Sequence, residues 1–510
     1  MSLRTDRGVR RDAPAFDRLL VANRGEIAIR VIRACRELGI SPVAIHSEVD
    51  ADALHVRLAD RSELIGPAAA SESYLRIEGV VEAALRSGAQ AVHPGYGFLS
   101  ENAAFARAVE DAGLVFVGPP PSALEALGNK LAARRSAADA GVPIVPGTTV
   151  ALEDDPAAVE AIGLPVMLKS AAGGGGRGMR RVDRLEDLAE SVASARREAM
   201  AAFGDGTVYV ERLISPARHV EVQLLGDRHG GLAVLGERDC SVQRRHQKLV
   251  EESPSPAVDE ATRESLFESA RRVAGTVEFH NAATVEFLLD AEGGHYFLEM
   301  NTRLQVEHGV TELVTGLDLV AWQIRVAAGE RLPARVLEAP RRGHSIEVRI
   351  YAEDPYDGFR PTAGTIGAWV MPDGPGVRVD AGVEADTPLR PEYDPLLAKV
   401  MVLADDRPSA LARLRRALDE TQIGGLQTDA GFLRWLLDDE AFAAGDYDTS
   451  FIAERWGAGP ALADHDAALV AAAAVQARGS GVGGGRTSSV TVAESLSAWG
   501  RRARQDALRR

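Results

Sequence analysis

The sequence reads Glu299-Met-Asn-Thr-Arg-Leu-Gln-Val-Glu-His308 at the end of an apolar, alternating segment, and this stretch is the best guide to the fold. It crowds two carboxylates, two amides and a guanidinium into a span too short to hide them in an apolar core. Polar groups placed so densely are typical of residues that line a site. We therefore expect this segment to form one wall of a ligand-binding site.

The residues just before this stretch predict a β-hairpin. Ala283–Leu289 and His295–Met300 each read as a strand, and Glu292-Gly293 between them reads as a two-residue turn. With that turn, Glu286 stands directly opposite Glu299. Opposed carboxylates repel each other unless a divalent cation takes oxygen ligands from both. The pattern favours a Mg²⁺ or Mn²⁺ site over the alternative, in which both carboxylates face solvent on the polar side of the hairpin.

A second signal is a glycine-rich loop that follows a short apolar strand. Residues 164–179 read Leu-Pro-Val-Met-Leu-Lys-Ser-Ala-Ala-Gly-Gly-Gly-Gly-Arg-Gly-Met, so Lys169 ends the strand and Arg177 follows the glycines. Glycines let backbone N–H groups close around phosphate oxygens. The residue order of a Walker loop and the helix start of a dinucleotide fingerprint are both missing. We expect a flap over a nucleotide; the alternative is a surface hairpin, which the two flanking cations disfavour.

Length and composition limit the class of protein. The 510 residues suit about three domains, and a hydrophobic content of 45% supports packed cores. A net charge of −16 argues against nucleic acid or an anionic membrane as a partner. Two cysteines, Cys35 and Cys240, exclude a disulfide scaffold and suit a cytoplasmic protein. No segment reaches transmembrane length, and Met1–Asp17 lacks the apolar core of a secretory signal.

The first part of the chain alternates strand and helix patterns. Leu19–Ala22 reads as a buried strand, Glu26–Leu38 as an amphipathic helix and Pro42–Ile45 as the next strand. Further units follow to about residue 125, which predicts a parallel doubly wound sheet. Polar motifs at Asn23–Glu26 and His93–Asn102 follow strands at their carboxyl ends, where open sheets bind ligands. For the second motif, a tight structural turn is the alternative.

The middle of the chain, residues 126–342, combines the glycine loop with strands of strict alternation. Residues 141–214 read as a small mobile lid. The block Arg238–Lys248 holds five cations or histidines. A charge run is usually a solvated face, but its position before the carboxylate hairpin favours a clamp for a polyanion.

A third region, residues 343–456, begins with the strand Ser345–Tyr351. Alternation along this strand places Arg349 on the opposite face from its apolar neighbours. After Trp456 the composition becomes rich in alanine and then glycine, which is typical of a flexible linker. The chain ends in a short basic helix, so residues 457–510 form a linker and tail.

Together these motifs closely resemble the biotin carboxylase component of biotin-dependent carboxylases, including acyl-CoA carboxylases of the alpha type. The resemblance spans roughly residues 17–456 in unbroken order and rests on Leu20–Arg30, His93–Asn102, the Lys169 glycine flap, Glu237–Lys248 and Glu299–His308. It implies an α/β protein of the ATP-grasp fold, with an N-terminal doubly wound (Rossmann-like) domain at 15–125, an ATP-grasp domain at 126–342 and a C-terminal α+β domain at 343–456. The implied reaction is ATP-dependent carboxylation of biotin by bicarbonate through carboxyphosphate.

The resemblance also implies which residues bind the nucleotide and its metal ions. ATP contacts would come from Lys130, Lys169, Gly173, Gly174, Gly175, Gly176, Glu211, Arg212, Ile214 and Leu288, and contacts at and near the ribose from His219, Gln243 and His246. Two Mg²⁺ or Mn²⁺ ions would bind Glu286, Glu299 and Asn301, in agreement with the hairpin argument.

The catalytic roles are implied in the same way. Lys248, Arg303, Gln305 and the Val306 amide would cradle bicarbonate, Glu307 would remove its proton, Arg349 would stabilise the biotin enolate, and Asp394 lies near this centre in the family. A fixed guanidinium suits a charge that exists only on the way to product. If the segment is extended, Arg303 shares a face with Glu307 and lowers its pKa.

The sequence departs from the family's pattern at four positions. Asn129 stands where Asp is usual, Arg212 where Lys is common, Gly309 where Pro usually follows the Glu-His pair, and Asp429 where Asn is typical. No proposed catalytic side chain is lost. Because Gly309 loosens the backbone and Asn129 removes a charge, we expect modest changes in affinity or rate.

The resemblance makes biotin a carrier-bound substrate, but none of the seven methionines is followed by the lysine of a biotin acceptor motif. We therefore expect the biotin carboxyl carrier and the carboxyltransferase on separate chains, with the basic tail docking them or disordered. Relatives are commonly dimers, so we expect a homodimer. Two other functions stay open: a catalytically silent assembly subunit, and another ATP-grasp ligase that activates a substrate carboxylate as an acyl phosphate.

Overall fold

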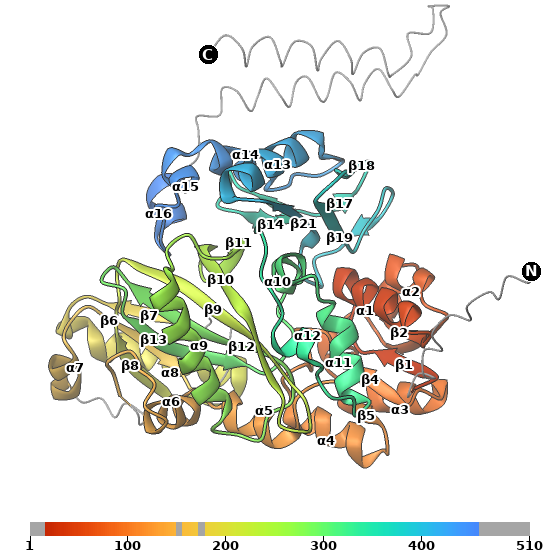
Figure 1. Ribbon diagram of the computed structural model, residues 1–510, viewed down its shortest axis with the longest axis horizontal. Helices are drawn as coiled ribbons and strands as arrows, with labels where there is room; N and C mark the ends of the chain where they lie inside the picture. Colours follow the sequence, from red (N-terminus) through yellow and green to blue (C-terminus); the bar gives the residue numbers. More distant parts are fainter. Residues whose placement is uncertain (1–15, 149–155, 172–178, 458–510) are drawn as a thin grey trace, which may run out of the picture. The chain divides into compact units, whose positions relative to one another are not determined.

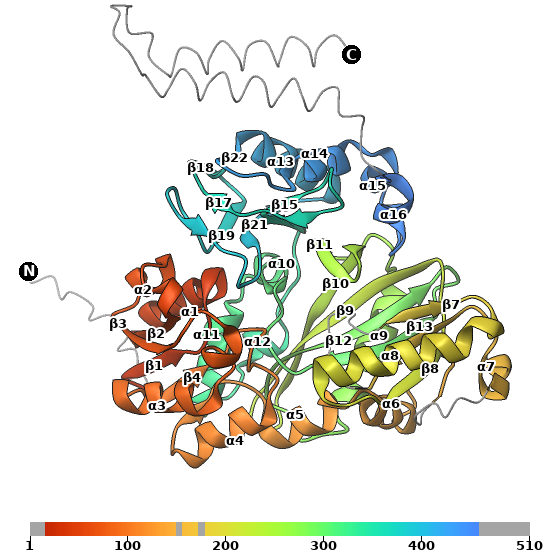
Figure 2. The ribbon, with the colours of Figure 1, turned by 180° about the vertical axis from the view of Figure 1, so that it is seen from behind.

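The computed structural model describes residues 16–148, 156–171 and 179–457, and its first region is a parallel sheet in the order β3-β2-β1-β4-β5 (Figures 1 and 2). Its elements are β1 (Arg18–Val21), α1 (Gly25–Glu37), β2 (Ser41–Ser47), α2 (Leu54–Leu58), β3 (Arg61–Gly66), α3 (Ile77–Ser87), β4 (Ala91–His93), α4 (Ala103–Asp111) and β5 (Val115–Phe116). Leu19 and Val21 pack in one core with α1, whereas Leu20 and Ala22 pack in another with α3 and α4. Both faces of the sheet are therefore covered, which confirms the predicted doubly wound arrangement.

The two polar motifs of this region meet at the carboxyl ends of β1 and β4. The Asn23 side-chain amide donates to the carbonyls of Pro94 and Tyr96, at 2.7 Å each. Gly95 has a φ of +64°, and a Cβ atom there would lie 2.9 Å from the Asn23 nitrogen. The second motif is thus a tight turn that only glycine permits, and its Tyr96 also lines the cavity described below.

A mainly antiparallel sheet of eight strands occupies the middle of the molecule, in the order β13-β12-β9-β10-β11-β14-β21-β19. Its strands are β9 (Ala217–Gly226), β10 (Leu232–Arg244), β11 (Gln247–Ser253), β12 (Asn281–Asp290), β13 (His295–Asn301), β14 (His344–Tyr351), β19 (Val377–Ala381) and β21 (Leu396–Ala404). The helices α9 (Glu260–Ala274), α10 (His308–Thr315), α11 (Leu319–Ala327) and α12 (Ala334–Leu337) follow from the same part of the chain. Because β11 pairs with β14, the sheet continues across the predicted boundary at residue 343.

The hairpin β12–β13 has the predicted strands but not the predicted turn. Glu286 does pair with Glu299. The loop between the strands has three residues rather than two, because the Asp290 amide donates to the Gly294 carbonyl at 2.9 Å. That loop shifts the register by one residue, and a β-bulge between Glu286 and Phe287 shifts it back. The facing carboxylates are therefore confirmed, although the two-residue turn is wrong.

A small three-stranded sheet, β7-β6-β8, lies within the predicted lid segment. Two helices precede this segment, α5 (Pro121–Gly128) and α6 (Lys130–Asp139). The segment itself contains α7 (Pro156–Ile162), β6 (Val166–Ser170), β7 (Arg180–Val182), α8 (Leu188–Phe203) and β8 (Val208–Arg212). Val166, Leu168, Val192 and Val210 form a core of its own between the sheet and the helices. The predicted glycines Gly173, Gly174, Gly175 and Gly176, with Arg177, lie outside the described residues.

The last region packs helices against the end of the eight-stranded sheet. It contains the short strands β15 (Glu353–Asp354), β16 (Arg360–Pro361), β17 (Gly364–Thr365), β18 (Ala368–Val370), β20 (Pro388–Leu389) and β22 (Gln422–Gly424), and the helices α13 (Arg407–Glu420), α14 (Ala430–Asp438), α15 (Glu440–Ala444) and α16 (Phe451–Arg455). Asp429, one of the departures from the family's pattern, is fully buried, and its carboxylate accepts from the Tyr351 amide at 2.9 Å. Burial raises the pKa of Asp429 well above its usual value.

Asn129, another departure, caps helix α6. Its side-chain oxygen accepts from the Ala132 amide at 3.0 Å and so satisfies a donor that the helix leaves free. We expect Asn129→Ala to lower the free energy of unfolding by about 1 kcal/mol, whereas Asn129→Asp, an equally good cap, leaves it nearly unchanged. Urea unfolding of the two variants checks this. Equal stability of the alanine variant and the wild type would contradict the capping role.

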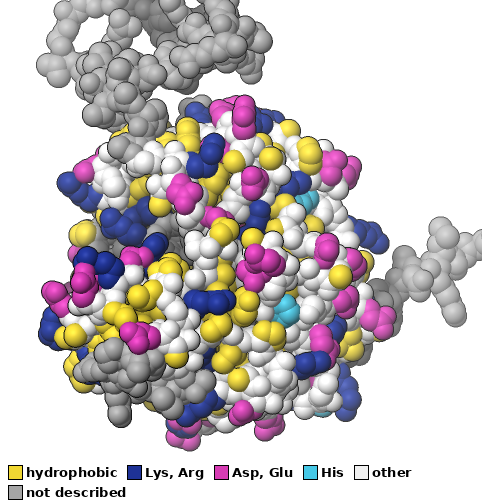
Figure 3. All heavy atoms as spheres, turned by 90° about the vertical axis from the view of Figure 1, so that its left-hand side faces the viewer, with side chains coloured by type: hydrophobic (Ala, Val, Ile, Leu, Met, Phe, Trp, Pro, Cys, Tyr) yellow, Lys and Arg dark blue, Asp and Glu magenta, His cyan; other side chains and the backbone are white. Residues whose placement is uncertain are grey.

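On the face of the molecule in Figure 3, acidic and basic side chains are interspersed with apolar ones. Among the described residues, no helix combines the length and apolar character needed to cross a membrane. Cys35 and Cys240 are both buried as free thiols.

Candidate functional site

A cavity of about 1120 Å³ is lined by residues from the N-terminal sheet, the small sheet, the eight-stranded sheet and the last region. Every predicted site residue that the structure describes lines this cavity: Lys130, Lys169, Glu211, Arg212, Ile214, His219, Gln243, His246, Lys248, Glu286, Leu288, Glu299, Asn301, Arg303, Gln305, Val306, Glu307, Arg349 and Asp394. Residues separated by more than two hundred positions in the sequence thus share one site. Their individual roles stay predictions.

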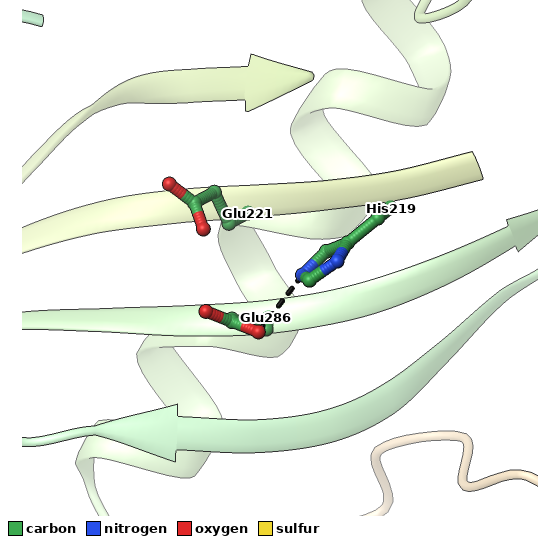
Figure 4. A group of neighbouring side chains, drawn as sticks. All are labelled: His219, Glu221 and Glu286. Atoms are coloured by element: carbon green, nitrogen blue, oxygen red, sulfur yellow. Dashed lines mark hydrogen bonds and ion pairs between the residues drawn. The ribbon is translucent and has the colours of Figure 1, made fainter. Parts of the chain in front are cut away.

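His219, Glu221 and Glu286 point toward one another from the neighbouring strands β9 and β12 (Figure 4). The His219 Nε2 atom lies 2.8 Å from a Glu286 carboxylate oxygen. Glu221 and Glu286 are direct cross-strand partners. Sequence reasoning missed Glu221, although its spacing of two from His219 places both on one face of a strand and could have revealed it.

Lys248 stands at the centre of the site, among three carboxylates. Its Nζ atom lies 2.5 Å from Glu221, 3.0 Å from Glu286 and 2.6 Å from Glu307. Glu221 and Glu307 are almost completely buried, and Lys248 is the cation that contacts both of them. Removing this ammonium would leave the carboxylates to repel in a medium of low polarity.

Glu307 is a buried carboxylate that lies between two cations, Lys248 and Arg349. Its second carboxylate oxygen accepts from the Arg349 guanidinium at 2.9 Å. Burial by itself would raise the pKa of Glu307, but Lys248 and Arg349 outweigh burial and hold the pKa well below its usual value. Glu307 therefore stays ionised and able to accept a proton.

The extended conformation expected for the segment that carries Arg303 is wrong, but its electrostatic interaction with Glu307 is present, because Glu307 is among the carboxylates that raise the pKa of Arg303. Residues 302–307 form bends and turns that lead into α10. Arg303 instead contacts Glu101 and Gln305, at 2.8 Å each. Glu101 belongs to the His93–Asn102 motif, so the N-terminal region holds this guanidinium at the cavity wall.

The facing carboxylates of the hairpin each have a cation beside them. Lys130 lies 2.8 Å from Glu299, and Lys248 serves Glu286, which also accepts from Asn301 at 2.8 Å. Burial opposes ionisation of Glu286, but Lys248 and His219 outweigh it and lower its pKa. Repulsion within the hairpin is thus relieved by the protein's own cations. Two ionised carboxylates and an amide oxygen are also the hard donors that suit Mg²⁺ or Mn²⁺.

Lys169 is fixed at the wall of the cavity by Glu211. The two charged groups lie 2.5 Å apart, and Arg134 holds the same carboxylate from α6, also at 2.5 Å. All three side chains are buried. The Glu211 carboxylate thus orients two cations at the cavity wall.

The charged block Arg238–Lys248 is not a single polyanion clamp. Arg238 is fully buried, and its guanidinium donates to Glu221, Gln223, Thr284 and Thr311. Arg244 pairs with Glu353 at 3.2 Å and lies over the Phe359 ring. Gln243, Arg245, His246 and Lys248 do line the cavity, so a polyanion clamp stays a prediction for this part of the block.

Arg349 has a second carboxylate partner that sequence reasoning missed. Its Nη2 atom lies 2.5 Å from Glu251 on the neighbouring strand β11. Glu251 is fully buried, and burial together with the repulsion from Glu307 raises its pKa to about 7 despite Arg349. The strand segment around Glu251 reads as an ordinary strand end, so no local signal marked it.

Gly309 has a packing reason that its sequence context did not reveal. A Cβ atom at this position would lie 2.2 Å from the Met401 sulfur, and Met401 is fully buried. We expect Gly309→Ala to lower the free energy of unfolding by about 1–3 kcal/mol through overpacking. In the double variant with Met401→Ala, the loss should be smaller than the sum of the two single losses, as measured by urea unfolding. Strict additivity would contradict the clash.

Three family profiles match consecutive parts of the chain. They are described as biotin carboxylase, N-terminal domain, at residues 15–124; carbamoyl-phosphate synthase L chain, ATP binding domain, at residues 129–335; and biotin carboxylase C-terminal domain, at residues 347–454.

Similar proteins agree with these profiles. A biotin carboxylase of Halalkalibacterium halodurans is 49% identical over 440 residues, covering 86% of this chain and 97% of the relative. The mitochondrial methylcrotonoyl-CoA carboxylase subunit alpha of Oryza sativa is 50% identical over 447 residues, which are 87% of this chain and 60% of that protein. A crystal structure of the biotin carboxylase domain dimer of Hydrogenobacter thermophilus 2-oxoglutarate carboxylase, in complex with MgADP, ADP and bicarbonate, matches with a TM-score of 0.84 and 45% identity, covering 86% of this chain and 97% of that one.

Proposed function

The chain belongs to the biotin carboxylase family, and from that premise we propose that it uses ATP and bicarbonate to carboxylate biotin through carboxyphosphate. One observation carries the proposal. An ionised, buried Glu307 lies between Lys248 and Arg349, in the same cavity as the Glu286–Glu299 hairpin. A base, two cations and paired metal ligands in one cavity are what bicarbonate activation by a nucleotide needs.

The residues of the cavity divide the work. Lys130 and Lys169 would bind the phosphates of ATP, and Glu286, Glu299 and Asn301 would hold Mg²⁺ or Mn²⁺. Bound there, such ions neutralise phosphate charge and orient the triphosphate. Phosphoryl transfer depends chiefly on such positioning, which side chains fixed by buried ion pairs supply.

Glu307 would accept the proton of bicarbonate, held by Lys248, Arg303, Gln305 and the Val306 amide. The freed oxygen then attacks the γ-phosphorus, the bond to ADP breaks, and carboxyphosphate forms. Carboxyphosphate would then pass its carboxyl group to the ureido nitrogen of biotin, the bond to phosphate would break, and the released phosphate would take the proton that the nitrogen loses. Arg349 would stabilise the enolate oxygen of biotin while this proton leaves. A guanidinium fixed by Glu251 and Glu307 is already in place when that charge develops.

The domain division 15–125, 126–342 and 343–456, with a lid at about 141–214, is part of the proposal, and the family profiles support it. We also propose that the biotin is presented by a carrier protein, that a carboxyltransferase completes the reaction and that two copies of the chain pair. Two relatives are named after different final acceptors although they match the same part of this chain. The choice of acceptor would therefore lie with the carboxyltransferase.

Bicarbonate-dependent release of ADP tests the proposal. The purified chain, with Mg-ATP, should release ADP when bicarbonate is added, and free biotin should increase the rate. Formate, acetate and other carboxylic acids, tried in place of bicarbonate, separate this reaction from that of another ATP-grasp ligase. Turnover with one of those acids but not with bicarbonate would overturn the proposal, as would folded, nucleotide-binding protein that releases no ADP.

A further inference from the structure

Lys399 is a fully buried lysine to which the proposed reaction gives no role. It lies on strand β21, and its Nζ atom donates to the Val306 carbonyl at 2.7 Å. The same ammonium lies 3.4 Å from a carboxylate oxygen of Glu26, at the start of α1. One side chain therefore connects the last region with the N-terminal region and with the loop that carries Glu307.

The charges around Lys399 keep it protonated. Burial opposes its charge, but Glu26, Glu347 and Asp380 outweigh burial and raise the pKa of Lys399, while Arg378 acts in the opposite direction. A buried ammonium persists only where carboxylates and acceptors compensate for the lost water. Lys399 can therefore donate to the Val306 carbonyl as an ammonium group.

Glu26 is itself held at its carboxylate by Tyr96 and packed at its backbone against Gly382, so it can anchor Lys399. The Tyr96 hydroxyl donates to the Glu26 carboxylate, and Asn23 fixes the Tyr96 backbone. Gly382 packs so closely that a Cβ atom there would lie 2.7 Å from the Glu26 amide nitrogen. The two polar motifs of the N-terminal region, which the proposed chemistry hardly uses, therefore converge on this carboxylate.

The bond from Lys399 acts on the peptide that joins Val306 to Glu307. This peptide is planar, so a fixed carbonyl oxygen also fixes the direction of the Glu307 amide and Cα. Lys248 and Arg349 hold the Glu307 carboxylate at the other end of the residue. Glu307 is thus fixed at its side chain by Lys248 and Arg349, and at its backbone by the hydrogen bond from Lys399 to the Val306 carbonyl.

We propose that Lys399 is a positioning residue that sets the Val306–Glu307 peptide for reaction with bicarbonate, and that Glu26 anchors it from the N-terminal region. The proposal rests on the function given above for Glu307. It also explains why the N-terminal region, which contributes little to the proposed nucleotide site, carries buried polar motifs.

Kinetics of Lys399→Met provide the first test. Misplacement of the base should lower kcat/KM for bicarbonate about 100-fold, while the affinity for Mg-ATP stays near that of the wild type. Arg263→Met is the matched control, because Arg263 also pairs with a buried carboxylate, Glu237, at 3.0 Å, but its hydrogen bonds go to Glu237, Glu260 and Val258 and not to the segment that carries Glu307. A control variant that loses as much bicarbonate activity, or a Lys399→Met variant that loses nucleotide affinity equally, would overturn the positioning role.

Glu26→Gln keeps the shape of the Glu26 side chain but removes its charge, and it provides a second test if Lys399→Met does not fold. It should lower the same kinetic constant in the same direction but by a smaller factor. The double variant should be no slower than Lys399→Met, because the two residues act along one route. If the double variant loses kcat/KM for bicarbonate by the product of the two single factors, the two residues act independently, and Glu26 does not act through Lys399.

Amide hydrogen exchange of residues 302–310 provides a readout that does not require turnover. In Lys399→Met, or in Glu26→Gln, exchange in this segment should become about tenfold faster, and in Arg263→Met it should not change. Unchanged exchange overturns the inference. If the wild type shows no bicarbonate-dependent ADP release, the proposed function fails, but exchange still decides whether Lys399 holds the segment.

Discussion

Glu307→Gln should lower bicarbonate-dependent ADP release by a factor of about 10² to 10⁴, the range that a positioned general base contributes. The amide has nearly the same shape as the carboxylate and can still accept from Lys248, but it cannot take a proton from bicarbonate. The measurement is the initial rate of ADP release at saturating Mg-ATP and bicarbonate, with free biotin present.

The affinity for Mg-ADP should be unchanged in Glu307→Gln, which shows that the cavity is intact. Glu237→Gln is the control, since Glu237 is a fully buried carboxylate held by Arg263 and does not line the cavity. It should retain most of the wild-type rate. Turnover of Glu307→Gln at the wild-type rate would show that another group acts as the base.

Lys248→Met should have the second large effect, on stability as well as on activity. Three carboxylates would lose the ammonium that lies within 3.0 Å of each. Removing one partner from such a buried group lowers the free energy of unfolding by about 3–5 kcal/mol. Urea unfolding measures this loss, and Lys248→Arg, which keeps the charge, should recover a large part of it.

The same substitution should change how activity depends on pH. In the wild type, the pKa of Glu307 lies well below its usual value, so the base is ionised throughout the working range. Without Lys248 the pKa of Glu307 rises, so residual activity should be lost as the pH falls and should recover as it rises. A pH–rate profile with the wild-type shape would mean that Lys248 does not control the charge of Glu307.

The sequence predicted those parts of the site that local patterns determine. Alternation fixed the strands of the hairpin and so brought Glu286 opposite Glu299, even though the turn was misjudged by one residue. The resemblance to the family supplied the other predicted residues that line the cavity. Both signals act over short stretches of chain, in which spacing alone decides which side chains share a face.

Contacts between distant elements could not be read in this way. Lys248 meets Glu221, Glu286 and Glu307 only because β9, β11 and β12 lie in one sheet and the residue just before α10 packs beside them. Arg238 looked like part of an exposed charge run, but its partners come from β9, β12 and α10. The role of Lys399 likewise depends on three regions that the sequence separates by more than 370 residues at the extreme.

The spacing of strands in the eight-stranded sheet sets the distances between the side chains of the site. Four of these side chains lie on strands of this sheet, whose order includes β12-β9-β10-β11-β14: Glu286 on β12, Glu221 on β9, Lys248 on β11 and Arg349 on β14. Backbone hydrogen bonds keep neighbouring strands about 4.8 Å apart. Changes in the lengths of the loops between strands would leave that spacing unchanged. A shift of β14 by a single residue, in contrast, would turn Arg349 away and present Val348 or Ile350 in its place. The strand register is therefore constrained by the site more strictly than the lengths of the loops.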